Sequence, residues 1–329
     1  MTLGIFTVVD HYPNEIDRTV GRLYHELLEQ AERADALGFE SFWVAEHHFH
    51  AYGVVPRPAI VLAAAAMRTR RIGLGAAVVV VPFDHPLRIA EDFAMIDQLS
   101  GGRLMLGVGS GYLSHEFDGF GIARDEKRAR FDEGVEVMMR AWSGERFSFD
   151  GEAYRVDEIA INVLPVRRPH PPLWVAILGN AAAYHIGRRG LPIMMIPYAT
   201  TESFDELADT AAAFRRGWAE SGCDPADATI RFALHVHCAA TTGQARAEAR
   251  EPMERYVRTR LYAKKRSFEL LIEKDLIAVG DRDEIRRVMN RYEEVGMTHM
   301  MAITSFGGFE GERVLRSMEL LGEMVNRKV

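Results

Sequence analysis

Short apolar runs alternate with helical patterns along almost the whole of this 329-residue chain, and this alternation restricts the folds open to it. Strands that read as near-continuous apolar runs are typical of parallel sheets covered on both faces. Eight strand–helix units in a chain of this length predict an α/β fold, a (β/α)8 TIM barrel with insertions. The predicted strands are 3–8, 40–44, 72–79, 104–108, 173–177, 192–196, 230–238 and 298–303.

The segments between these runs carry apolar residues at helical spacing. In the first of them, Leu23, Leu27 and Ala31 form an apolar stripe, and Gly38 follows where the pattern stops. The predicted helices are 18–37, 56–68, 86–99, 126–142, 180–189, 203–220, 243–261, 282–295 and 311–326.

Two segments interrupt the alternation. Residues 144–172 combine alternating aromatic residues with a proline-rich end, which predicts an inserted β-hairpin. Residues 259–280 contain Lys264-Lys265-Arg266 and form a candidate lid loop over a barrel, although a solvated surface helix explains them equally well. The chain has no evident linker and no repeat beyond the strand–helix period, so we expect a single TIM-barrel domain over 1–329.

Composition excludes several classes of function. A net charge of −7 and a pI near 6.0 argue against a nucleic-acid-binding protein, which would carry a basic excess. The longest apolar run, Ile72–Val81, is about half of the roughly 20 residues that a membrane span needs. Cys223 and Cys238 form no CxxC motif, and the first residues read as a strand rather than a signal peptide. We therefore expect a cytoplasmic protein that binds neither membranes nor nucleic acids.

The strongest candidate for a catalytic site is Glu46-His47-His48-Phe49, directly after the apolar run Phe42-Trp43-Val44. Catalytic groups of a TIM barrel lie at the C-terminal ends of its strands, and histidine changes its charge near neutral pH. Neighbouring side chains on an extended chain point to opposite faces, so one histidine can face the barrel mouth while the other lies against the wall. No HExxH or other zinc spacing occurs, and we expect no metal.

Two glycine-containing turns are candidate ligand contacts. Gly107-Val108-Gly109-Ser110-Gly111 is not a dinucleotide fingerprint, because the last required glycine is Tyr112. These glycines fit either a flat ligand lying close to the backbone or simply a tight turn. At Gly179-Asn180, a predicted strand meets a predicted helix, whose free N–H groups could bind a phosphate. Asn180 could equally be a plain N-cap.

Several motifs together resemble the luciferase-like flavin-dependent monooxygenases, and the resemblance runs essentially from end to end. The motifs are the opening strand Met1–Phe6, Gly38-Phe39, Glu46-His47-His48-Phe49, Val81-Pro82, His85-Pro86, Asp97-Gln98-Leu99-Ser100-Gly101-Gly102-Arg103 and Gly190-Leu191-Pro192. The glutamate–histidine stretch and the stretch from Asp97 to Arg103 are highly specific in combination.

The resemblance implies a barrel that holds reduced FMN at the strand C-termini. It places the active-site histidine at His47, its neighbouring acid at Glu46, and a non-proline cis peptide under the flavin ring near Ala77-Val78. Further implied cofactor contacts are Gly109, Ser110, Glu116, Arg128, Leu178, Gly179, Asn180 and Ala181. Gly109 and Ser110 depart from the light-emitting members, which carry a reactive cysteine and a phosphate-binding arginine there. Backbone amides would therefore carry more of the phosphate contact.

The activity implied is that of a two-component monooxygenase. A separate NAD(P)H:flavin reductase would supply FMNH2, and a C4a-peroxyflavin would transfer one oxygen atom of O2 to an aldehyde, ketone or heteroatom compound. His47 would act as general acid–base, and Glu46 would orient it or stabilise its protonated form. Phe6, Trp43, His48 and Tyr112 are the predicted substrate wall. The resemblance also implies a homodimer, paired through the helices after strands two and three.

Two other functions fit the same residues. Related barrels bind the deazaflavin F420 and transfer hydride without oxygen. A flavin-binding subunit without turnover is the third interpretation, and the intact Glu46-His47 pair argues against it.

Overall fold

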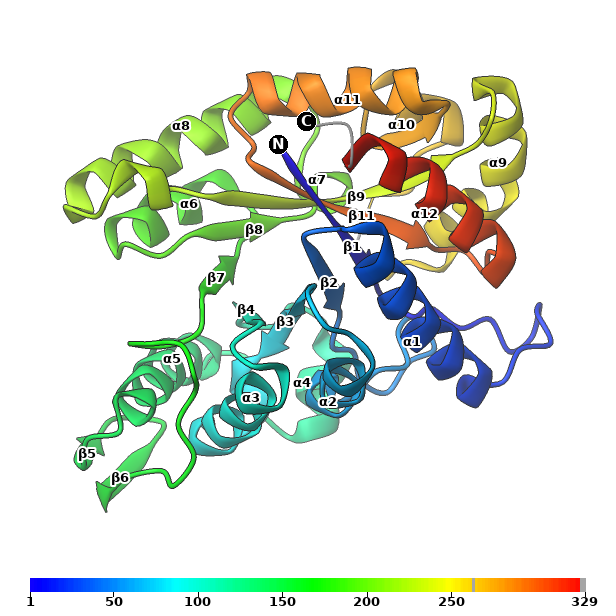
Figure 1. The fold of residues 1–329 in the computed structure, drawn as a ribbon. Coiled ribbons are helices and arrows are strands. Elements are labelled where there is room, and N and C mark those ends of the chain that lie inside the picture. Colours follow the sequence, from blue (N-terminus) through cyan, green and yellow to red (C-terminus); the bar gives the residue numbers. More distant parts are fainter. Residues whose placement is uncertain (262–263, 326–329) are drawn as a thin grey trace.

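The computed structural model describes residues 1–261 and 264–325, and its central element is a closed barrel of eight parallel strands (Figure 1). Neighbouring strands pair in the order β1-β2-β3-β4-β7-β8-β9-β11, and β11 pairs again with β1. This confirms the predicted (β/α)8 fold. The barrel strands are β1 (Thr2–Thr7), β2 (Ser41–Val44), β3 (Gly73–Val80), β4 (Leu104–Gly109), β7 (Leu173–Ala176), β8 (Ile193–Met195), β9 (Ile230–Cys238) and β11 (His299–Ser305).

Helices surround the barrel and bury one face each against it (Figure 1). In α1, the Thr19 side chain accepts a hydrogen bond from the Arg22 N–H at the start, and Gly38 ends the helix in the left-handed conformation at φ 81°. The long helices are α1 (Val20–Leu37), α2 (Pro58–Arg68), α3 (Pro86–Ser100), α5 (Lys127–Ser143), α6 (Asn180–Arg188), α8 (Phe204–Ser221), α9 (Thr242–Thr259), α11 (Arg282–Glu294) and α12 (Gly311–Val325).

A ninth parallel strand, β10 (Ile277–Gly280), pairs with the C-terminal half of β9 outside the closed barrel. Together with the short helix α10 (Phe268–Glu273), it lies within residues 259–280, the segment that the sequence suggested as a lid loop. A four-residue strand is too short to show a reliable period, which is why the pattern did not reveal it. Residues 262 and 263 of the candidate lid and the last four residues of the predicted domain lie outside the described residues.

The segment before α10 is attached to the neighbouring loop by basic side chains. The Arg266 guanidinium donates to the backbone carbonyls of Tyr198 and Thr201, and Lys264 forms an ion pair with Glu202 at 2.6 Å. Arg266 also pairs with Glu202 at 3.0 Å. Hydrogen bonds from these two cations lower the pKa of the Glu202 carboxyl to about 2. Movement of this segment as a lid remains a prediction.

The insertion between β4 and β7 contains two antiparallel strands, β5 (Phe147–Asp150) and β6 (Arg155–Ile159), which project away from the barrel (Figure 1). A further short helix, α4 (Ser114–Phe120), follows the glycine turn after β4. The sequence did not predict α4, because seven residues give too few turns for an apolar stripe. The remaining short helix, α7 (Pro197–Thr200), follows β8.

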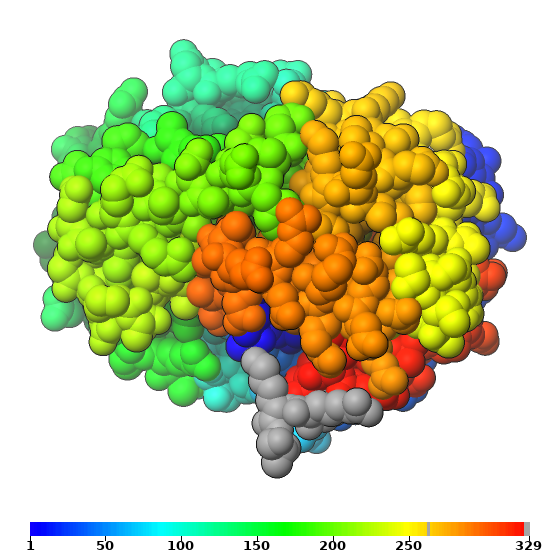
Figure 2. All heavy atoms as spheres, turned by 90° about the horizontal axis from the view of Figure 1, so that it is seen from above, coloured from blue at the N-terminus to red at the C-terminus, as the bar shows by residue number. Residues whose placement is uncertain are grey.

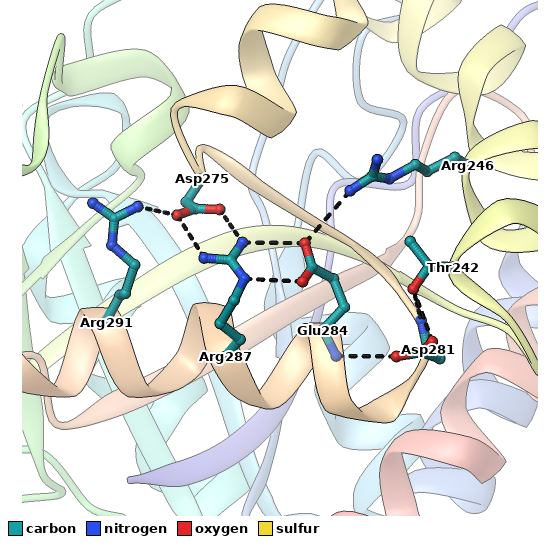
Figure 3. Close-up of polar contacts among 7 residues, drawn as sticks. All are labelled: Thr242, Arg246, Asp275, Asp281, Glu284, Arg287 and Arg291. Atoms are coloured by element: carbon teal, nitrogen blue, oxygen red, sulfur yellow. Dashed lines mark hydrogen bonds and ion pairs between the residues drawn. The ribbon is translucent and has the colours of Figure 1, made fainter.

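An ion network fixes β10 and α11 to α9 (Figure 3). The buried Asp275 carboxylate binds Arg287 at 2.6 and 3.1 Å and also pairs with Arg291. Arg287 pairs in addition with Glu284, whose carboxylate reaches Arg246 of α9 at 3.5 Å. Figure 2 views the side of the molecule on which α11 lies, with α8 and α9 on either side of it.

Two negative findings hold for residues 1–261 and 264–325. No helix there is long and apolar enough to cross a membrane. Within the same ranges, no group of three or more His, Cys, Asp or Glu side chains is arranged to hold a metal ion.

Candidate active site

A cavity opens at the C-terminal ends of the barrel strands, and we call it the main cavity. Its empty volume, including the solvent at its mouth, is about 940 Å³. An apolar wall with three methionines is supplied by β1 and the residue after it, and by β8, β9 and β11: Phe6, Val8, Met194, Met195, Ala233 and Met301. Phe6 and Tyr112 of the predicted substrate wall line this cavity.

His47 lines the main cavity and is held from behind by Glu116 of α4. Its Nδ1 lies 3.2 Å from Glu116 Oε1, and the same oxygen accepts the backbone N–H of His48 at 3.0 Å. Burial lowers the pKa of the His47 imidazole, although the hydrogen bond to Glu116 opposes this effect. A neutral His47 that donates Nδ1–H to Glu116 keeps Nε2 as a proton acceptor.

Glu46 does not orient His47, contrary to the expectation from sequence. Its Oε1 lies 3.1 Å from Nε2 of His48, and both side chains are largely buried. Residues 46 and 48 are two positions apart, so on an extended chain their side chains lie on one side and can contact each other, although Glu46 also lines the main cavity. Burial raises the pKa of the Glu46 carboxyl, and the hydrogen bond with His48 opposes this rise.

His48 lines a second space, which we call the side cavity, instead of the main cavity. The side cavity lies between the starts of α2 and α3, and Phe49, Phe83 and Phe120 contribute its aromatic wall. The His48 ring packs edge-on against Phe83 and Phe120. The assignment of His48 to the substrate wall is therefore corrected.

Trp43 also lies outside the main cavity, so its assignment to the substrate wall is wrong. Trp43 is fully buried between β7 and β9. Its ring centroid lies 5.9 Å from that of Trp174 and 5.1 Å from the guanidinium of Arg231. A Cβ atom on Gly75 of β3 would collide with its indole. Trp43 comes four residues before His47 and fills a lower layer of the barrel interior, as bulky side chains do in this fold.

A buried arginine supports the tyrosines of the main cavity. The Arg260 guanidinium lies 4.0 Å from the ring centroid of Tyr52 and 3.8 Å from that of Tyr256. It donates to the Tyr52 carbonyl at 3.2 Å and pairs with Asp10 at 3.5 Å. Tyr52 in turn packs edge-on against His47, at 4.2 Å between ring centroids, and its hydroxyl contacts that of Tyr112. Arg260 thus joins the segments that follow β1, β2 and β9.

The wall formed by β3, β4 and β7 consists of small residues. Ala77, Val78, Gly109, Ser110 and Ala176 line it, and the Ala77–Val78 peptide bond is cis, at the position implied by the resemblance. A Cβ atom on Gly109 would lie 2.6 Å from Val78 Cγ2, so glycine is required for this close approach. The wall leaves room for a flat ring system.

The main cavity continues into an outer depression at the start of α6. Ser110, Ala176 and Ile177 line both spaces. The outer depression adds three basic residues, Arg124, Lys127 and Arg128, and two acidic ones, Asp125 and Asp132, with Ala181 and the N-terminus of α6 beside them. This arrangement suits an anion, because the first N–H groups of a helix point outward and carry partial positive charge.

The predicted phosphate contacts occupy this region in different ways. Leu178 lines the main cavity and Ala181 the outer depression, while Gly179 is the N-cap of α6 and has open space around its α-carbon. Asn180 is the first helical residue rather than the N-cap, and its side chain accepts a hydrogen bond from Thr210. Arg128 lines the depression, with its side chain 84% exposed and paired with Asp132.

Sequence reasoning missed Tyr52, Tyr256 and Arg260, and it assigned Glu116 only to the cofactor. Tyr52 follows His47 in the same loop, which is a usable signal. Arg260 belongs to a stretch with other arginines that reads as a solvated helix end, so only the structure shows that its side chain is fully buried.

Comparison with known proteins identifies relatives over the whole chain. The family model described as luciferase-like monooxygenase matches residues 1–299. The crystal structure of the monooxygenase RslO1 from Streptomyces bottropensis superposes with a TM-score of 0.91, at 32% identity and with 98% of each chain covered. The FMN complex of the oxygenating constituent of 3,6-diketocamphane monooxygenase from Pseudomonas putida has the same fold, with a TM-score of 0.86 at 20% identity over 100% of this chain and 98% of that one.

Two further relatives match about half of the chain. The oxygenase component of the flavin-dependent trigonelline monooxygenase of Acinetobacter baylyi is 32% identical over 178 residues, which is 54% of this chain and 49% of the relative. The F420-dependent glucose-6-phosphate dehydrogenase of Intrasporangium calvum is 34% identical over 175 residues, 50% of this chain and 52% of the relative.

Proposed function

Because the chain belongs to the luciferase-like monooxygenase family, we propose that this oxidoreductase is the FMNH2-dependent oxygenase of a two-component system. Its substrate would be a small organic compound, an aldehyde, a ketone or a heteroatom compound. A separate NAD(P)H:flavin reductase would deliver the reduced flavin, as the name of the trigonelline relative suggests for that protein. The observation that carries the proposal is the His47–Glu116 pair on the wall of a cavity with a flat, small-residue side.

The residues present fit FMN. Ala77, Val78 and Gly109 would lie against the isoalloxazine ring, and the ribityl chain would pass Ser110. The phosphate would lie in the outer depression, bound by the N–H groups of residues 179–181 and by Arg128. Reduced flavin supplies the electrons that activate O2, and the protein supplies position and electrostatics.

His47 is the acid–base group of this proposal. Its neutral imidazole, oriented by Glu116, accepts a proton from the substrate side of the main cavity at Nε2 and returns it later. The Glu116 carboxylate stabilises the imidazolium form in the interval. The apolar wall from Phe6 to Met301 keeps water away from the reacting atoms.

The test is a direct assay of the purified protein. With FMN, a flavin reductase and NADH, a panel of aldehydes, ketones and thioethers should yield a product that contains one atom of 18O from 18O2. His47→Ala should lower product formation by about 10²–10⁴-fold. FMN affinity should stay within a few-fold, because His47 is not among the proposed phosphate or ring contacts. Product formation by His47→Ala at the wild-type rate would contradict the assignment.

A second candidate function is hydride transfer with F420, favoured by the match to an F420-dependent dehydrogenase. Anaerobic titration separates the two functions. Tight binding of F420 and reduction of F420 by an alcohol substrate without O2 would favour this alternative over the monooxygenase. Retention of flavin without turnover of any kind would instead indicate a non-catalytic subunit.

We also propose that the chain forms a homodimer through α2 and α3. Ile60 and Met67 of α2 and Met95 and Leu99 of α3 are 71%, 64%, 53% and 48% exposed, which is unusual for large apolar side chains on neighbouring helices. A second copy of the same face would bury them.

A further inference from the structure

Glu46 and His48 form a buried titratable pair that the proposed acid–base step does not use. Their side chains are 10% and 8% exposed, and the Glu46 Oε1 to His48 Nε2 distance of 3.1 Å suits a hydrogen bond. A carboxylate–imidazole pair in this geometry can share or pass a proton.

Glu46 lies in the wall between two cavities. It lines the main cavity, where His47 lies, and also the side cavity, where His48 lies. Val80 is the other residue common to both cavities. On its outer side, the side cavity is lined by Phe49, which is 62% exposed, and by Arg57, whose side chain is 48% exposed. The pair thus stands between the substrate side and a space that opens to solvent.

We propose that His48 and Glu46 form a proton relay from the solvent of the side cavity to the main cavity. His48 takes a proton from water at Nδ1 and gives up the proton on Nε2 to Glu46 Oε1. The Glu46 carboxyl then releases a proton into the main cavity and becomes a carboxylate again, which leaves His48 with its remaining proton on Nδ1. Loss of that proton to the water of the side cavity and uptake of one at Nε2 restore the starting tautomer of His48. In this scheme Glu46 delivers the proton, and His48 acts through Glu46.

The relay rests on the proposed monooxygenase function, which creates the demand for a proton. When the reduced flavin is bound as its anion, FMNH⁻, O2, substrate and one H⁺ give FMN, oxygenated substrate and water. Without substrate, FMNH⁻, O2 and one H⁺ give FMN and H2O2. Each turnover therefore takes up one proton in a cavity whose wall is otherwise mostly apolar.

The surroundings allow Glu46 to hold a proton. Burial raises the pKa of its carboxyl, while His48 and the more distant charge of Arg57 act in the opposite direction. The backbone of His48 is fixed on both sides, since its N–H donates to Glu116 and its carbonyl contacts Nε2 of His115 at 3.1 Å. The pair is therefore held in register while the proton moves.

The first test needs no flavin. In the apoprotein, infrared difference spectra between wild type and Glu46→Gln, recorded as the pH is lowered, should show the C=O stretch of a protonated carboxyl growing in. On transfer to D2O, the shift of this band reports how fast a proton reaches Glu46. His48→Gln should slow the shift at least about tenfold if His48 carries the proton. Asp92→Asn, which removes a carboxylate from the same side cavity without contacting Glu46, should leave the rate unchanged.

The second test uses the protein loaded with reduced FMN. After rapid mixing with O2, the rate of return to oxidised FMN should fall about 10²-fold in His48→Ala, with unchanged FMN affinity. Imidazole added to His48→Ala should restore the rate in a concentration-dependent manner, because the side cavity is open to small molecules. A purely structural role of His48 would not produce this rescue.

The outcomes separate the relay from the function on which it rests. Unchanged exchange and oxidation rates in the His48 variants, or a loss of rate that imidazole does not restore, would overturn the relay alone. A wild-type protein that binds no FMN or oxygenates no substrate would overturn both proposals.

Discussion

Glu116 determines which ring nitrogen of His47 is available to the main cavity. The two residues are 69 positions apart in the chain, and the carboxylate comes from α4, a helix of seven residues. The same carboxylate oxygen also accepts the backbone N–H of His48, so one side chain fixes both the imidazole and the strand end that carries it. A histidine becomes a general base only when such a partner selects its tautomer.

Glu116→Gln should lower kcat by about 10–10²-fold with a smaller change in KM. A neutral amide keeps the shape of the side chain but cannot stabilise the imidazolium form of His47. Steady-state kinetics with the identified substrate measure the effect. Glu126→Gln is a suitable control, since that exposed residue at the start of α5 forms an ion pair only with Arg130 among the described residues. Equal kcat values for Glu116→Gln and wild type would contradict the role of Glu116.

A second residue-scale prediction concerns His235, which is fully buried among Tyr198, Tyr256 and Phe306. Burial, with a contribution from the charge of Arg260, lowers the pKa of His235 to about 3. Between pH 6.5 and about pH 3, the unfolded state therefore carries a proton on His235 that the folded state lacks. His235 therefore does not lower the unfolding free energy above pH 6.5. Below pH 6.5 the unfolding free energy falls as the pH falls, by up to about 1.4 kcal/mol per pH unit.

The variant His235→Phe should remove this dependence. Urea unfolding at pH 7 and pH 5 should show a smaller loss of stability for His235→Phe than for wild type, because phenylalanine fits an aromatic cluster and takes up no proton. Identical losses in the two proteins would show that His235 stays neutral in both states.

At the scale of elements, charged side chains join the start of β10 to α11 and α11 to α9, while strand pairing joins β10 to β9 of the barrel. β10 contributes four residues to the sheet, while Asp275 just before it binds two arginines of α11 (Figure 3). The backbone of Asp275 is left-handed at φ 50°, a conformation that aspartate and asparagine tolerate. The sequence pattern showed α11 clearly but could not show this attachment, because charged residues on a helix read as a solvated face.

Asp275→Asn should reduce the unfolding free energy by about 1–3 kcal/mol, since it removes the charge of a buried carboxylate but keeps its backbone conformation. Asp283→Asn, at a 97% exposed position in α11, should change the unfolding free energy by less than about 0.5 kcal/mol. Thermal unfolding by circular dichroism provides the comparison. A similar effect of both substitutions would mean that the ion network adds no stability.

At the scale of the whole molecule, the surface of α2 and α3 exposes more large apolar side chains than a surface in contact with water usually does. Four large apolar side chains are exposed there, whereas α1, α11 and α12 contribute none to the most exposed apolar residues among those described. α2 follows β2 and the Glu46–His48 pair, and α3 follows β3, which contains the cis peptide. A partner chain bound to these helices would therefore contact elements that position the site.

Met95→Glu should convert a homodimer into a monomer, because it places a charge in a face that must lose its water to pair. Val166→Glu, at a 48% exposed position in the insertion, should leave the mass in solution unchanged. Sedimentation velocity would measure both. A wild-type protein that sediments as a monomer would remove the basis for this interface.

The sequence by itself determined the barrel, because the continuous apolar runs of the strands and the 3.6-residue apolar period of the helices are local patterns that need no tertiary information. It also determined where the site lies, since the polar cluster after Phe42-Trp43-Val44 had to be at a strand end. Only the tertiary structure decided which side chains contact one another at the site. It paired His47 with Glu116, turned Glu46 toward His48, moved Trp43 into the barrel interior and buried Arg260 between two tyrosines. These contacts depend on the angle and register at which distant elements meet, and no local pattern encodes that geometry.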